Sequence, residues 1–103
     1  IGMQIVRASD SIAANISEGF GRYHFKEIKQ FGYYARGSLF ETRTWLWKAY
    51  RRKKIDKRKY EELVRILDDL GIRLNNYIKS QGGRTGNDVK EDPFHPNYVN
   101  RQD

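Results

Sequence analysis

The strongest structural signal in the chain is the stretch from Tyr60 to Tyr77, which reads YEELVRILDDLGIRLNNY. Its apolar residues recur in alternating steps of three and four: Tyr60, Leu63, Leu67, Leu70, Leu74 and Tyr77. This spacing puts them on one stripe of a helix, which we expect over about 57–80. Asp56 suits the N-cap, because its carboxylate can accept a hydrogen bond from a free amide of the first turn. Gly82 and Gly83 are expected to end the helix.

Two more helices are expected upstream. The first covers about 1–18, where the apolar residues Ile1, Ile5, Ala8, Ile12 and Ile16 share one face. Gly19 follows, at a position where a left-handed C-terminal cap favours glycine. The second covers about 24–53, and its core positions Ile28, Ala35, Thr42 and Ala49 repeat every seven residues, as in helical bundles. We expect a neighbouring helix to approach it closely at Gly37 and Ser38.

These elements predict an all-α protein, an antiparallel up-and-down bundle over 1–80. The segment 81–103 contains Pro93 and Pro96, has no apolar period, and is expected to be a flexible or extended tail. Its Phe94, Tyr98 and Val99 are candidates for docking on a groove, with an unattached tail as the alternative.

The second helix has five aromatic residues outside its main stripe, which predicts cover by another helix or another subunit. These are Tyr33, Tyr34, Phe40, Trp47 and Tyr50.

The positive charge is concentrated in one part of the chain. The 103 residues carry a net charge of +7, and residues 20–55 alone carry +8. Eight basic residues fall within twelve positions, with only Asp56 opposing them: Lys48, Arg51, Arg52, Lys53, Lys54, Lys57, Arg58 and Lys59. Beside Trp45, Trp47 and Tyr50 they offer charge for phosphates next to rings for stacking, a pattern typical of nucleic-acid binding. A merely solvated basic face is the alternative.

The composition argues against several classes of protein. Cysteine is absent, which excludes disulfides and thiolate metal sites, and no apolar run is long enough for a membrane span. His24 and His95 are far apart in the chain, and no metal, nucleophile or phosphate-loop motif accompanies them. We therefore expect a cytoplasmic protein with no catalytic residues, no metal and no cofactor.

The stretch from Arg7 to Arg22, RASDSIAANISEGFGR, is similar to a known signature. Its matching residues are Ser11, Asn15, Glu18 and Gly19, followed further on by Gly37 and Ser38. Over about residues 4–80 the chain resembles the bacterial 23S rRNA-intervening sequence protein family, which also includes the accessory variability protein of diversity-generating retroelements. We expect a structural role for the motif. Ser11 and Asn15 should bond within their helix, and Glu18 should pair with Arg22 or Arg43.

The resemblance implies a four-helix bundle, with the family's long first helix absent before Gln4. It also implies a ring-like homopentamer with a positively charged surface, non-enzymatic, that binds RNA or DNA. A reverse transcriptase is a further partner that it suggests. Five other basic residues are candidates to extend the nucleic-acid-binding surface: Arg22, Lys26, Lys29, Arg36 and Arg43. The competing hypothesis is a structural module whose basic face meets an acidic protein.

Overall fold

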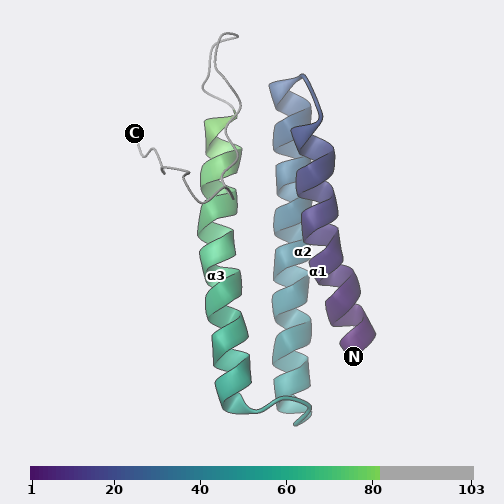
Figure 1. The fold of residues 1–103 in the computed structure, drawn as a ribbon, viewed down its shortest axis with the longest axis vertical. Coiled ribbons are helices and arrows are strands. Elements are labelled where there is room, and N and C mark those ends of the chain that lie inside the picture. Colours follow the sequence, from purple (N-terminus) through teal and green to yellow (C-terminus); the bar gives the residue numbers. More distant parts are fainter. Residues whose placement is uncertain (82–103) are drawn as a thin grey trace.

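The computed structural model describes residues 1–81, which form three α-helices (Figure 1). They are α1 (Gly2–Phe20), α2 (Phe25–Arg51) and α3 (Lys57–Ser80). Consecutive helices run in opposite directions and are joined by short connections, so the prediction of an all-α antiparallel bundle is confirmed. Of the expected tail 81–103, the structure describes Gln81, which is buried and caps the end of α3. The rest of this segment, with Gly82, Gly83 and its aromatic residues, lies outside the described residues.

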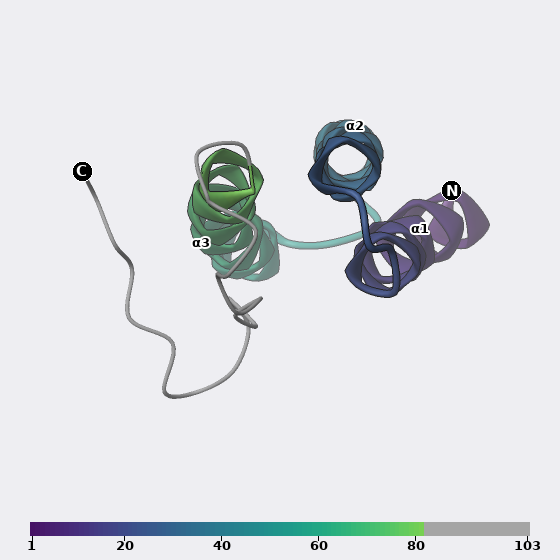
Figure 2. The same cartoon turned by 90° about the horizontal axis from the view of Figure 1, so that it is seen from above.

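The central helix α2 packs against both of the others. Seen along the bundle axis, α1 and α3 lie on either side of it (Figure 2). Within residues 1–81, the backbones of α1 and α3 do not approach each other closely. The three helices therefore form two antiparallel pairs that share α2.

The core is built from the stripes that the sequence predicts. In α2 the buried positions follow the seven-residue repeat, from Ile28 through Ala35 and Leu39 to Leu46. Leu67 and Leu74 of α3 face them, together with Tyr77, whose ring stacks on that of Phe20 at 6.3 Å between centroids. Ala8 and Ile12 are the buried apolar side chains of α1.

The glycines lie in different environments from those expected. Gly19 does not form a left-handed cap. The helix α1 continues through it to Phe20, and a Cβ at Gly19 would lie 2.7 Å from Phe31 Cβ of α2. The expected close approach at Gly37 is also wrong, because Gly37 is exposed with open space around it. The close approach occurs at Gly32, where a Cβ would lie 2.7 Å from Ile78 Cγ1 of α3.

The connection between α2 and α3 has two backbone features that fix its path. Lys53 adopts a left-handed conformation with φ 59°, and the amides of Lys53 and Lys54 donate to the carbonyls of Tyr50 and Ala49. This is the Schellman arrangement that commonly ends helices, and it stops α2 two residues before the expected end. The predicted cap at Asp56 is confirmed, since its Oδ1 accepts a hydrogen bond from the Lys59 amide at 2.7 Å.

Four of the five aromatic residues outside the main stripe of α2 are exposed. Tyr33, Tyr34, Phe40 and Trp47 have exposed fractions of 44%, 50%, 58% and 50%. Tyr50 differs, because it stacks on Tyr60 of α3 with 4.7 Å between ring centroids. The predicted exposed aromatic surface of α2 is therefore present in these four residues, but Tyr50 is not part of it.

Candidate nucleic-acid interface

The eight basic residues of the predicted site lie together at one end of the bundle. Lys48 and Arg51 belong to the last turn of α2, and Arg52, Lys53 and Lys54 to the connection. The first turn of α3 carries Lys57, Arg58 and Lys59. All are exposed except Lys48, which is half-buried. We call this set of eight the basic end; it surrounds the α2–α3 connection at the bottom of Figure 1.

Little negative charge opposes the basic end. The carboxylate of Asp56 serves as the helix cap of α3. Among residues 1–81, the ion pairs of this set are limited to Lys59 Nζ with Glu62 Oε2, 3.8 Å apart and more than half exposed on both sides. An exposed pair of this kind is worth about 0–1 kcal/mol, so it leaves most of the charge available to an anion.

The connection forms an open hollow of about 720 Å³ at the basic end. Arg51, Lys53 and Lys54 line it together with Tyr50, Ile55 and Asp56. Lys53 is the only residue other than glycine with a positive φ within 1–81. A side chain in this conformation costs about 1–2 kcal/mol, and strained residues of this kind tend to cluster at functional sites. The connection therefore has a lysine at a position where glycine would adopt the backbone conformation without steric cost.

Two tryptophan rings stand next to the basic end, each with a cation over its face. Lys48 Nζ lies 4.7 Å from the ring centroid of Trp45, and Arg51 Cζ lies 5.5 Å from that of Trp47. Trp47 is exposed and Trp45 half-buried. Of the three rings expected to offer stacking surfaces, Tyr50 is the one whose ring is stacked within the protein, on Tyr60.

The five further basic residues lie along α2 and just before it, outside the basic end. Arg22 contacts Glu18 and Glu27 at the opposite end of α2, at 2.6 and 3.8 Å. Arg43 binds Asp68 of α3 at 2.6 Å. Arg36 lies over the ring of Tyr33 and donates a hydrogen bond to Asn75 Oδ1 at 3.0 Å. The two others, Lys26 and Lys29, lie on the first turns of α2.

The signature residues of α1 form polar contacts within α1 and with its neighbours. Asn15 Nδ2 donates to the Ser11 carbonyl at 2.8 Å and lies 3.2 Å from Ser11 Oγ. Ser38 Oγ of α2 donates to Ser11 Oγ at 2.9 Å, so the serines link the two helices. Glu18 pairs with Arg22, one of the two partners expected for it. The close approach predicted at Ser38 is thus correct, although that at Gly37 is not.

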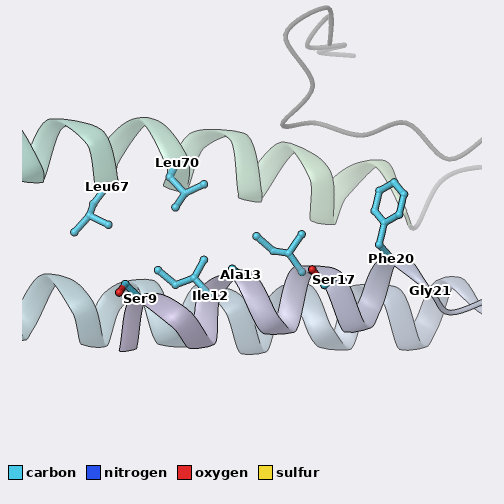
Figure 3. Close-up of a pocket in the computed structure, with 9 residues that line it drawn as sticks. Ser9, Ile12, Ala13, Ser17, Phe20, Gly21, Leu67 and Leu70 are labelled. Atoms are coloured by element: carbon cyan, nitrogen blue, oxygen red, sulfur yellow. The ribbon is translucent and has the colours of Figure 1, made fainter. Parts of the chain in front are cut away.

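An apolar groove separates α1 from α3. Figure 3 shows Leu67 and Leu70 of α3 pointing towards α1 and Ile12 pointing back across this space, with Phe20 further along α1, its ring reaching the α3 ribbon. The groove has a volume of about 800 Å³. The other lining residues are Ser9, Ala13, Ile16, Ser17 and Gly21. The apolar spacing of each helix is visible in the sequence, but the groove itself depends on how far apart α1 and α3 are held.

Within residues 1–81, no group of three or more His, Cys, Asp or Glu side chains is arranged to hold a metal ion. None of the three described helices combines the length and apolar character needed to cross a membrane.

Comparison with known proteins places the chain in a family. No curated protein and no solved structure matches it. The family model for the 23S rRNA-intervening sequence protein matches residues 1–76, which include α1, α2 and most of α3. Because this match covers well over half of the chain, the protein belongs to the 23S rRNA-intervening sequence protein family.

Proposed function

We propose that this protein is a non-enzymatic accessory protein that binds RNA or DNA through its basic end. The observation that carries the proposal is the gathering of eight basic side chains around one helix connection, with Asp56 already engaged as a cap. Helix C-termini favour cations, which accounts for Lys48 and Arg51 on the last turn of α2. It does not account for the basic residues of the connection or of the first turn of α3, where positive charge opposes the helix dipole.

Nucleic-acid binding through these side chains should depend steeply on salt. Each phosphate neutralised releases condensed counterions, so log K falls with log salt at a slope of about −0.9 per phosphate for duplex DNA and about −0.7 for a single strand. Fluorescence anisotropy with labelled RNA and DNA, across a series of salt concentrations, measures this slope. Unchanged anisotropy of both probes at low salt would refute the proposal.

A matched pair of variants assigns the binding to the basic end. Lys53→Gln with Lys54→Gln removes two exposed charges at the connection, and we expect the magnitude of the salt slope to decrease by about 2. Arg7→Gln with Arg65→Gln removes two exposed charges from α1 and from the middle of α3. This control should leave the slope almost unchanged. Equal losses from both pairs would show that net charge, and not the basic end, determines binding.

The second candidate is a structural module whose basic end meets an acidic protein. The same charge supports it, because carboxylates also bind guanidinium and ammonium groups. Binding of purified protein to nucleic acid without any other protein separates the two functions. A reverse transcriptase remains a proposed partner, and an adjacent reverse transcriptase gene would favour it. If the gene instead lies inside a ribosomal RNA gene, ribosomal RNA would be the favoured partner.

We further propose that the bundle is completed by a fourth helix in the groove and that it assembles as a homo-oligomer, with a pentamer as the expected size. Exposed Val6 and Ile66 extend the apolar lining, since they lie one or two turns from Ser9, Ala13 and Leu70 on the same helix faces. Apolar surface on this scale is uncommon on soluble monomers. Light scattering that shows a monomer at micromolar concentration would contradict the oligomer.

A further inference from the structure

Three exposed rings form a straight row along α2. Tyr33, Phe40 and Trp47 are separated by seven residues each, which is two helical turns, so they lie on one face about 10 Å apart. All three side chains are about half exposed. The row covers about 21 Å of the helix, and its last ring, Trp47, stands beside Arg51 of the basic end.

Positive charge accompanies the rings of this row. Arg36 Cζ lies 4.8 Å from the ring centroid of Tyr33, and Arg51 Cζ lies 5.5 Å from that of Trp47. Phe40 is four residues after Arg36 and three before Arg43, so both belong to neighbouring turns of the same face. Asp68 of α3 is the acidic group held by Arg43, at 2.6 Å. Rings and cations thus alternate along the row.

We propose that the nucleic acid bound at the basic end is single-stranded, and that it continues along α2 with bases stacked on Tyr33, Phe40 and Trp47. This inference rests on the proposed function. Bases in a duplex are already paired and stacked, so exposed rings add nothing to duplex binding, whereas an unpaired strand offers its base faces. A guanidinium over one face of a ring leaves the other face for a base and supplies charge for a phosphate.

The row distinguishes this partner from an acidic protein. The carboxylates of an acidic protein bind arginine and lysine, and they do not require aromatic rings at every second turn. A single-stranded nucleic acid uses both the cations, for its phosphates, and the rings, for its bases. Base–ring stacking tolerates any sequence because every base has a π-face. The row carries three rings, so three bases of one strand can stack on it. We therefore expect affinity to increase with oligonucleotide length until the strand spans all three rings.

The test compares an unstructured oligouridine with an RNA hairpin that has the same number of phosphates. Phe40→Leu keeps an apolar side chain and removes the ring, and it should weaken oligouridine binding at least about fivefold, the lower end of the stacking contribution of one base. Hairpin binding should not change. Tyr34→Leu is the matched control, because Tyr34 is an exposed ring on the same helix outside the row. It should leave both affinities unchanged.

Tryptophan fluorescence gives a second readout that does not depend on affinity. In a Trp45→Phe variant the signal comes from Trp47, which should be quenched by oligouridine and not by the hairpin. In a Trp47→Phe variant the half-buried Trp45 reports, and its signal should change much less.

The outcomes that contradict the two proposals can be told apart. If the unmodified protein binds no nucleic acid at all, both the proposed function and this inference are refuted. Equal affinity for hairpin and oligouridine, or equal effects of Phe40→Leu and Tyr34→Leu, refutes the single-strand inference alone. A change in oligomeric mass caused by Phe40→Leu, with oligouridine affinity retained, would assign the row to contacts between copies of the chain and also overturn the inference.

Discussion

Replacing Gly37 or Gly32 of α2 by alanine should have different effects on the stability of the protein. Alanine is favoured over glycine in a helix interior by about 1 kcal/mol. At Gly37 a Cβ meets nothing within 4 Å, so Gly37→Ala should stabilise the protein by about that amount. At Gly32 the added Cβ would lie 2.7 Å from Ile78 Cγ1, in the packed contact between α2 and α3. Overpacking of this kind costs about 1–3 kcal/mol, which cancels or exceeds the helix gain.

The predicted difference between Gly37→Ala and Gly32→Ala is therefore about 1–3 kcal/mol. Urea unfolding followed by circular dichroism measures it, and thermal midpoints should differ by about 4–8 °C for each kcal/mol in a chain of this size. Equal stabilisation by both substitutions would refute the reasoning. A second measurement locates the cause. In an Ile78→Ala background the clash partner is gone, so Gly32→Ala should become more favourable by about 1 kcal/mol or more.

Three further substitutions test local features, all by urea unfolding. Asp56→Ala removes the cap on the Lys59 amide and should cost about 1 kcal/mol, whereas Asp56→Asn should cost much less. Leu74→Ala should cost about 2–5 kcal/mol because Leu74 is fully buried, and Ile72→Ala, on an exposed residue of the same helix, should cost little. Lys53→Gly should stabilise by about 0.5–1 kcal/mol, since glycine adopts the left-handed conformation without a steric penalty. A loss of stability in this last variant would show that the Lys53 side chain stabilises the connection.

Features that depend on neighbours along the chain could be predicted from the sequence. The leucine stripe of α3, the Asp56 cap and the Glu18–Arg22 pair each involve residues within a few turns of one another. Helical periodicity and capping chemistry determine such features directly. The basic end belongs to the same group, because its eight residues are nearly contiguous in the chain.

Features that depend on a neighbouring helix could not be predicted. In the sequence, Gly19, Gly32 and Gly37 look alike, since each interrupts a helical pattern. Only the structure shows that Gly19 packs on Phe31 and Gly32 on Ile78, whereas Gly37 is exposed. Tyr50 looks like the other surface aromatics until Tyr60 is placed against it. The row of Tyr33, Phe40 and Trp47 has a visible seven-residue spacing. Its exposure and its alignment with Arg36 and Arg51 required the structure.

The sharing of α2 by two helix pairs has a consequence for how the molecule opens. Within residues 1–81, α1 and α3 pack on α2 and have no close backbone contact with each other, although Phe20 of α1 stacks on Tyr77 of α3. Either helix can therefore detach from α2 while the other stays bound, at the loss of this ring stack. Hydrogen exchange should then report two separate opening events, with the slowest amides in α2. A helix in the groove would contact Ile12 on one side and Leu67 on the other, and it could bind only when both pairs are formed. Its binding would couple the two openings into one cooperative transition.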